Sequence, residues 1–304
     1  MTRFWLRVLR SFGSLPLPVT RALGAALGAL LYLVAADRRR VARINLRACF
    51  PQMRERERRA LSRAHFRAFA QSVLDRGLIW WGSRARIEKH VRWIDLHHFE
   101  EAAAQGPVIV LAPHFVGLDA GGVRFSMLMH AISMYSHQKN KVLDDAILAA
   151  RSRFNKPLLL SRQDGMRGAI RAMRRGLSFY YLPDMDFGAR DAAFVPFFGV
   201  SAATITAPAR LARITHARVV PCVTRMTTDG YEVRFYPAWT DFPDRADEAP
   251  GALGPAALAP TTLAHAARRM NAFIEERVLE MPEQYLWTHK RFKTRPPGDA
   301  KFYR

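Results

Sequence analysis

Residues 108–121 read VIVLAPHFVGLDAG and combine the pattern of a buried strand with polar side chains directly after it. An unbroken apolar run opens the stretch, a proline ends the run, and His114 follows, with Asp119 five positions later. A core strand that leads into a surface turn would explain this pattern without any chemistry. A catalytic base and its orienting acid would explain it equally well, so the rest of the chain has to decide.

The spacing of His114 and Asp119 restricts how the two side chains could meet. Within one helix, five positions place side chains about 140° apart, on different faces. A contact therefore requires His114 in the turn and Asp119 in the first turn of the next helix, where a carboxylate is electrostatically favoured. Gly117 permits such a turn. Asp119 would then bind one imidazole nitrogen and leave the other as a general base.

Around this stretch, short apolar runs alternate with helix-like segments. Further apolar runs lie at 131–135, 177–182, 217–224 and 231–238. Helical patterns lie at 165–175, 203–216 and 261–280, and residues 243–260 read as a loop. Strands that alternate with helices predict a mostly parallel or mixed sheet with helices packed on it. The predicted fold class is therefore α/β, a mixed central sheet flanked by helices.

The N-terminal part has a different character. Residues 22–36 read ALGAALGALLYLVAA without a charge, which is shorter than the roughly 20 residues of a perpendicular membrane span. Aromatic residues and arginines alternate before this run, and three arginines at 38–40 follow it. A signal peptide and a buried core helix are the alternatives. We expect an uncleaved membrane anchor or an in-plane interfacial helix, with the arginines on the cytoplasmic side.

The chain is therefore divided into three predicted parts. Residues 1–36 form the membrane anchor or interfacial helix, residues 37–90 a helical segment packed on the core, and residues 91–304 the catalytic domain. Apolar residues at helical spacing run through 37–90, where Trp80 and Trp81 fit a core position and an interfacial anchor equally well.

Composition limits the compartment and the partners. Hydrophobic residues make up 49% of the 304, which favours a real core over disorder. Lys and Arg outnumber Asp and Glu by 47 to 26, a formal net charge of +21 that suits nucleic acid, an anionic membrane surface, or an acidic protein or substrate. The two cysteines, Cys49 and Cys222, provide neither a disulfide framework nor metal-ligand spacing, and a reducing compartment fits best.

Two further stretches carry candidate binding residues. Arg162 opens an arginine-rich segment, 161–176, that is either a solvated basic face or a site for a phosphate or an oxyanion. Residues 182–200 contain Asp184 and Asp186 as a D-x-D pair, a pattern that holds a metal in some glycosyltransferases but is common by chance.

The end of that second stretch, FVPFFGV, is unusually apolar. It places Phe197 and Phe198 after a proline, and a proline in its middle argues against a central strand. A core strand is the simple reading. A hydrophobic groove wall for an acyl chain is the functional one.

Together these blocks resemble the late acyltransferases of bacterial lipid A biosynthesis (lauroyl and myristoyl transferases). RRRVARINLRACFP, HFVGLD, RQDGMRGAIRAMRRG, YYLPDMDFGARDAAFVPFFGVSAAT and ARVVPCVTR follow in the expected order. RMNAFIEERVLEMPEQYLWTHKRFKTRPPG near the end is the most specific stretch. The similarity covers nearly the whole chain and implies a glycerolipid-acyltransferase-like fold.

The resemblance implies a function and roles for individual residues. A fatty acyl group would pass from acyl carrier protein to a hydroxyl of an acyl chain on a Kdo-bearing lipid A precursor, without metal or cofactor. His114 would be the base and Asp119 its support, although many relatives carry Glu there. Arg162 would contact an oxyanion or a phosphate. The third block contributes Asp184, Asp186 and Gly188 to substrate binding.

The implied partners and compartment agree with the basic charge. Acyl carrier protein is acidic, the lipid acceptor is phosphorylated, and the lipids of the bacterial inner membrane, at whose cytoplasmic face the reaction would occur, are anionic. The main alternative is an acyltransferase of the same superfamily that acts on another membrane lipid. A remote alternative is a non-catalytic basic module that binds membrane or nucleic acid, although we expect no nucleic-acid partner.

Overall fold

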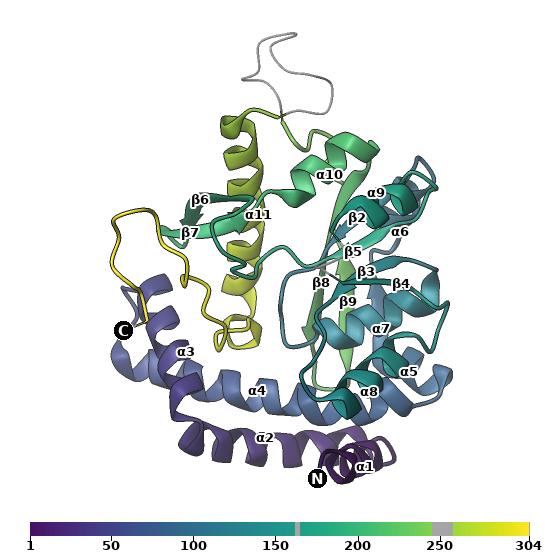
Figure 1. The fold of residues 1–304 in the computed structure, drawn as a ribbon. Coiled ribbons are helices and arrows are strands. Elements are labelled where there is room, and N and C mark those ends of the chain that lie inside the picture. Colours follow the sequence, from purple (N-terminus) through teal and green to yellow (C-terminus); the bar gives the residue numbers. More distant parts are fainter. Residues whose placement is uncertain (162–164, 245–257, 304) are drawn as a thin grey trace.

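A seven-stranded mixed sheet forms the centre of the protein (Figure 1). The structure is a computed structural model that describes residues 1–161, 165–244 and 258–303. Every neighbouring pair of strands is parallel except β8 and β9, which are antiparallel. The strands lie in the order β1 (Val91–Ile94), β9 (Tyr231–Phe235), β8 (Arg218–Met226), β2 (Val108–Leu111), β5 (Phe179–Tyr181), β3 (Ile132–Tyr135) and β4 (Leu158–Ser161). The predicted α/β fold class is confirmed.

Helices cover both faces of the sheet. Strand β2 shows why both faces need cover, since Val108 and Val110 belong to one core cluster, Ile109 and Leu111 to the other, and all four are buried. The first face is covered by α4 (Glu55–Trp81), α5 (Arg84–His90), α6 (His97–Ala103), α7 (Leu118–Leu128) and α8 (Lys141–Arg151). The second is covered by α9 (Arg167–Met173), α10 (Ala207–Thr215) and α11 (Pro260–Glu280).

A separate hairpin holds the apolar FVPFFGV segment. Strands β6 (Ala192–Phe197) and β7 (Val200–Ile205) pair only with each other, as expected for a strand with a proline in its middle. Phe198 and Gly199 form the two-residue turn with φ of 49° and 76°, the backbone that a type I′ hairpin turn requires. The hairpin joins α3 (Ala36–Cys49), α11 and η2 (Pro282–Gln284) around a third apolar cluster.

The N-terminal helices lie against α4 along the base of the molecule in Figure 1. Among the described residues, α2 (Leu17–Val34) is the helix long and apolar enough to cross a membrane; α1 (Thr2–Phe12) precedes it. Gly24 and Gly28 allow α2 to approach α4 closely, because a Cβ at Gly28 would lie 2.5 Å from the Arg67 Cα.

A buried ion pair fixes α2 to α4 and the sheet. The Arg21 Nε donates to Asp75 of α4 at 2.8 Å, and Arg21 also donates to the carbonyl oxygens of Thr227 and Gly230. The Tyr231 hydroxyl donates to the same Asp75 carboxylate at 2.6 Å. One buried arginine therefore connects α2, α4 and the β8–β9 connection.

We expect Arg21→Met to lower the free energy of unfolding by about 3–5 kcal/mol, because it leaves the Asp75 charge buried without its cation. Urea unfolding followed by circular dichroism measures the loss. Arg174→Met, at an exposed arginine just after α9, is the matched control and should change stability by less than about 0.5 kcal/mol. Equal stability of the two variants would contradict a structural role for the pair.

Candidate active site

His114 and Asp184 are hydrogen-bonded at the carboxyl-terminal edge of the sheet. The His114 Nδ1 lies 2.7 Å from an Asp184 carboxylate oxygen, and the His114 backbone N–H donates to both carboxylate oxygens at 3.0 and 3.1 Å. The Asp184 side chain is 1% exposed and that of His114 16%. The Asp184 carboxylate therefore binds both the imidazole and the backbone N–H of His114.

The strand register explains the pairing. β2 and β5 are parallel neighbours in which Leu111 lies opposite Tyr181. His114 and Asp184 each come three residues later, so the two chains continue side by side past their hydrogen-bonded ends. Because the carboxyl ends of parallel strands meet at one edge of the sheet, that edge is where an open α/β sheet usually binds its ligand.

The charge of Asp184 fixes the tautomer of His114. Burial acts to raise the pKa of the Asp184 carboxyl group, but the neighbouring His114 charge and its hydrogen bonds outweigh burial and hold the pKa below its usual range. An ionised carboxylate only accepts hydrogen bonds, so Nδ1 carries the proton. The other nitrogen, Nε2, makes no hydrogen bond with any residue that the structure describes, and its lone pair is available as a base.

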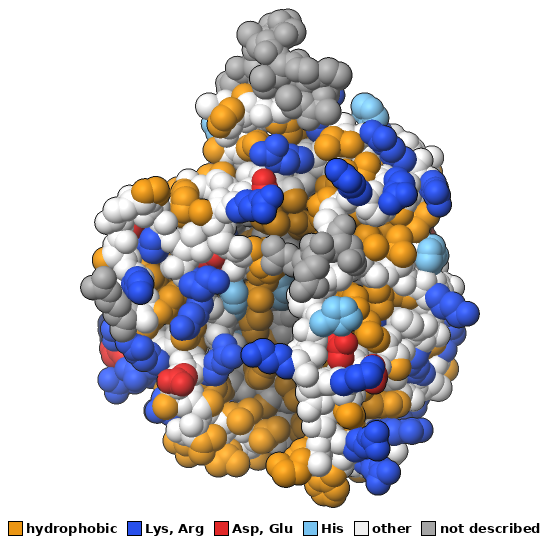
Figure 2. All heavy atoms as spheres, in the orientation of Figure 1, with side chains coloured by type: hydrophobic (Ala, Val, Ile, Leu, Met, Phe, Trp, Pro, Cys, Tyr) orange, Lys and Arg blue, Asp and Glu red, His pale blue; other side chains and the backbone are white. Residues whose placement is uncertain are grey.

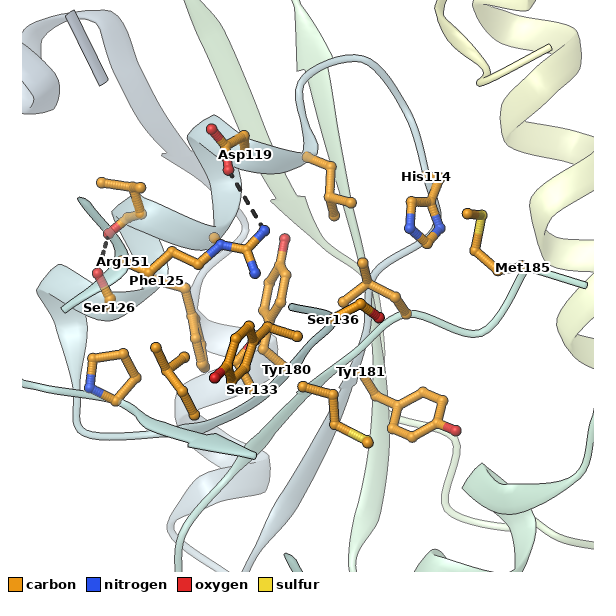
Figure 3. Close-up of a pocket in the computed structure, with 18 of the residues that line it drawn as sticks. His114, Asp119, Phe125, Ser126, Ser133, Ser136, Arg151, Tyr180, Tyr181 and Met185 are labelled. Atoms are coloured by element: carbon orange, nitrogen blue, oxygen red, sulfur yellow. Dashed lines mark hydrogen bonds and ion pairs between the residues drawn. The ribbon is translucent and has the colours of Figure 1, made fainter. Parts of the chain in front are cut away.

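Asp119 does not contact His114, and the predicted pairing of these two residues is wrong in this respect. Asp119 lies in the first turn of α7, as expected, but its carboxylate accepts a hydrogen bond from the Trp80 indole N–H at 2.6 Å. It also pairs with Arg76 at 3.4 Å and Arg151 at 3.9 Å. These partners from α4 and α8 hold the carboxylate away from the imidazole (Figure 3).

Asp186 fastens the C-terminal segment rather than facing the pocket. Its buried carboxylate accepts hydrogen bonds from the backbone N–H groups of Gly188 and Thr294 and from the Thr294 hydroxyl. The Asp186 N–H donates to Nε2 of His289 at 3.1 Å. Asp186 and Gly188 therefore form a turn, with Gly188 at a φ of 101°, that binds the C-terminal segment. Their substrate-binding role stays a prediction.

The C-terminal segment surrounds the His114–Asp184 pair with buried polar groups. Burial lowers the pKa of His289 to about 4, so this second histidine is neutral at neutral pH. Arg291 is 2% exposed and donates to Ala203, Thr204 and Asn271. Its charge also helps to keep Asp184 ionised. Neither residue was singled out from the sequence, although both lie in the stretch that carried the strongest family resemblance.

A cavity of about 400 Å³ opens beside His114. Figure 3 places His114 on one side of this cavity and Phe125 on the other. Most of the wall is apolar, and it is contributed by α4, α7, β3 and β5. Arg76, Asp119 and Arg151 form the charged part of the wall. The volume falls within the range of about 300–1,000 Å³ that is usual for small-molecule sites.

The two phenylalanines predicted to form an acyl groove lie elsewhere. Phe197 is fully buried, and its ring packs 5.7 Å from that of Tyr285 in the third core cluster. Phe198 forms the hairpin turn and contacts Phe50. Neither lines the cavity, so the core-strand reading of FVPFFGV is the correct one. Arg162 lies outside the described residues.

Within residues 1–161, 165–244 and 258–303, no three His, Cys, Asp or Glu side chains are grouped so that they could hold a metal ion. The D-x-D pair is instead divided between the imidazole and the C-terminal segment.

The fold and the site define a class of α/β protein in which a histidine, hydrogen-bonded to a buried aspartate, borders a mostly apolar cavity. The family model of the bacterial lipid A biosynthesis acyltransferases matches residues 1–294. The chain is 35% identical to the lipid A biosynthesis lauroyltransferase of Escherichia coli K12 over 99% of its own length and 95% of that protein. It is 30% identical to the palmitoleoyltransferase of the same strain over 100% and 94%, and 32% identical to the myristoyltransferase over 92% and 83%. The chain belongs to the bacterial lipid A biosynthesis acyltransferase family.

Replacing Asp184 should lower the reaction rate strongly. In Asp184→Asn we expect the rate to fall about 10²-fold or more, since the imidazole loses the acceptor that fixes its tautomer.

Asp119→Asn serves as the matched change at the carboxylate without a contact to His114. We expect its rate to fall less than that of Asp184→Asn. Initial rates of the two variants and the wild type give this comparison. A larger loss in Asp119→Asn than in Asp184→Asn would reverse the assignment.

Proposed function

We propose that this protein transfers a fatty acyl group from acyl carrier protein to a hydroxyl of an acyl chain on a Kdo-bearing lipid A precursor. The reaction occurs at the cytoplasmic face of the bacterial inner membrane and uses neither metal nor cofactor. The observation that carries the proposal is that His114, hydrogen-bonded to the buried Asp184, lies on the wall of a mostly apolar cavity in a chain of the lipid A acyltransferase family.

The proposed chemistry is a direct attack on a thioester. The acceptor hydroxyl lies against Nε2 of His114, which takes its proton as the oxygen attacks the thioester carbonyl carbon. Asp184 holds the Nδ1 proton and stabilises the imidazolium. The tetrahedral intermediate then collapses, the carbon–sulfur bond breaks, and the imidazolium returns a proton to the thiolate. The products are the acylated lipid and free acyl carrier protein. The histidine takes up one proton and releases one, so it ends in its starting protonation state.

Two side chains have less direct roles in this proposal. Asp119 positions Arg76 and Arg151, its ion-pair partners in the cavity wall. Of these three charges two are positive, so the charged part of the wall suits a polarised or anionic group of a substrate. The contact of Arg162 with an oxyanion or a phosphate stays a prediction.

The apolar part of the cavity suits the donor chain. The lining from Phe125, Ile132, Leu159 and Phe179 offers no hydrogen bond to a bound group, and each methylene buried there adds about 0.8 kcal/mol of binding. The net charge of +21 favours the other partners, because acyl carrier protein is acidic and the acceptor and inner-membrane lipids are anionic.

The central test is acyl transfer by wild type and His114→Ala. Labelled acyl carrier protein donor and a Kdo-bearing tetra-acylated precursor should give a product one acyl chain heavier. We expect His114→Ala to lower the rate by about 10²–10⁴-fold, since the variant lacks the base. His97→Ala, at an exposed histidine on α6, should retain full activity.

The outcomes separate mechanism from substrate. Full activity of His114→Ala would refute the proposed base. No transfer by the wild type to this precursor, together with His114-dependent acylation of another membrane lipid, would leave the mechanism intact and refute the acceptor. Loss of transfer when metal is removed with EDTA would refute metal independence.

Filling the cavity should change the preference for donor length. A Cβ at Gly122, in the wall, would lie 3.7 Å from the Tyr180 ring, which is ordinary contact. Gly122→Val should therefore fold and shorten the space for the chain, and kcat/KM should fall about fourfold for each methylene that no longer fits.

A series of donors of increasing chain length, tested with each variant, measures this effect. Gly168→Val in α9 is the matched control, because its Cβ also has room, 3.5 Å from Leu160, but lies outside the cavity wall. An unchanged length preference in Gly122→Val would show that the acyl chain binds elsewhere.

A further inference from the structure

The exposed large apolar residues of the described chain are concentrated at one end. Eight of the ten lie within residues 1–34, the other two being Phe187 and Leu279. Phe4 and Trp5 of α1 are each 61% exposed, and Leu33 of α2 is 69% exposed. Such a concentration of exposed large apolar side chains indicates an interaction site. We call these exposed residues of α1 and α2 the N-terminal apolar face.

Helix α2 is divided cleanly into two faces. At 100° per residue, Val19, Leu23, Leu30, Leu33 and Val34 fall within an arc of about 100°. The buried residues of the helix, Leu17, Thr20, Arg21, Gly24 and Gly28, fall within a second arc of about 100° that does not overlap the first. The second face packs on α4, and the first has no protein over it among the described residues.

The contacts of the buried face are inconsistent with a helix that leaves the domain. Arg21 is hydrogen-bonded to Asp75 and to two backbone carbonyl oxygens, and Gln71 of α4 donates to the Arg21 carbonyl oxygen. Gly24 and Gly28 fit so closely against Gln71 and Arg67 that a Cβ would overlap the α4 backbone. Helix α2 is therefore packed into the same domain as α4 and the sheet.

This packing decides between the two ways of binding a membrane. If α2 crossed the bilayer, it would draw α4 into the hydrocarbon with it. Along the same part of α4, Arg56, Arg59, Arg63 and Arg67 are exposed, and arginine in the bilayer interior is strongly disfavoured. With α2 parallel to the surface, the apolar face enters the lipid while long arginine side chains reach the headgroups.

The charges around the N-terminal apolar face suit anionic lipid. Arg3, Arg7 and Arg10 are exposed on α1, and Arg38 and Arg40 are exposed just after α2. A basic rim around an apolar face is the usual composition of an in-plane membrane helix. Figure 2 shows the hydrophobic side chains gathered along the lower edge of the molecule, with a hollow above them on the same face.

We propose that α1 and α2 bind in the plane of an anionic bilayer and do not span it. The inference deepens the proposed function, because α4 contributes Phe69, Ser72 and Arg76 to the cavity wall and α2 packs on the same helix. The cavity then lies one helix layer above the membrane surface, within reach of a lipid that stays in the bilayer.

Binding to vesicles tests the surface without any need for activity. Purified full-length protein should sediment with vesicles of phosphatidylglycerol and phosphatidylcholine, and at least tenfold less with phosphatidylcholine alone. Leu30→Gln/Leu33→Gln should weaken binding to the anionic vesicles at least tenfold. Leu30→Phe/Leu33→Phe is the matched control at the same positions and should bind like the wild type. Urea unfolding confirms that both variants are folded.

Sidedness tests the orientation. Ser14→Cys and Asp37→Cys lie at the two ends of α2, and the native Cys49 and Cys222 are buried, so their background is low. With protein bound to preformed vesicles, a membrane-impermeant maleimide added outside should label both introduced cysteines. Labelling of only one end would show a spanning helix and overturn the proposal.

Two further outcomes would overturn binding of α1 and α2 in the plane of the bilayer. Unchanged vesicle binding of Leu30→Gln/Leu33→Gln would overturn the proposal, because the membrane would then bind another surface. So would a wild-type dimer in sedimentation velocity that the same variant dissociates, since the face would then be covered by a second copy. Failure of acyl transfer to lipid A precursor, with binding and labelling as expected, would refute only the acceptor.

Discussion

The hydrogen bond between His114 and Asp184 is the interaction on which the site depends, and the sheet itself produces it. Two parallel neighbours, β2 and β5, end in register, so residues 70 positions apart in sequence leave the sheet together. The carboxylate also receives the backbone N–H of His114, which fixes the loop as well as the imidazole. The geometry of the pair therefore follows from strand pairing.

The protein distributes its acidic side chains among distinct tasks, and burial with the available partners separates them. Asp184 is buried and binds a histidine. Asp119 lies on the cavity wall and binds an indole N–H and two arginines. Asp186 binds the backbone N–H of Gly188 and the Thr294 hydroxyl. A sequence motif that pairs a histidine with an acid five residues later therefore describes two different parts of one cavity. The two motif residues share the cavity but not a hydrogen bond.

Much of the fold could be predicted from local pattern, because apolar runs and helical periodicity are local signals. Several predicted elements are present in the structure. They are the strands at 108–112 and 217–224, the helix after Gly117, and the strand around Pro196, which lies outside the central sheet as expected. The partner of His114 could not be found by local spacing, since it depends on which strands are neighbours. Strand order would have supplied it, given that Asp184 and His114 follow their strands by the same number of residues. The placement of Phe197 in an acyl groove could not be tested from the sequence for a related reason. An apolar run does not reveal whether its side chains line a cavity or fill a core, and Phe197 lies in a core cluster.

The attachment of Thr294 to Asp186 has a consequence for the order in which the protein becomes competent during synthesis. The segment that carries His289, Arg291 and Thr294 closes around Asp184 only after nearly the whole chain has left the ribosome. Helices α1 and α2 emerge first, and the segment around Asp184 emerges last. The N-terminal helices can therefore form long before His114 and Asp184 have all of their neighbours.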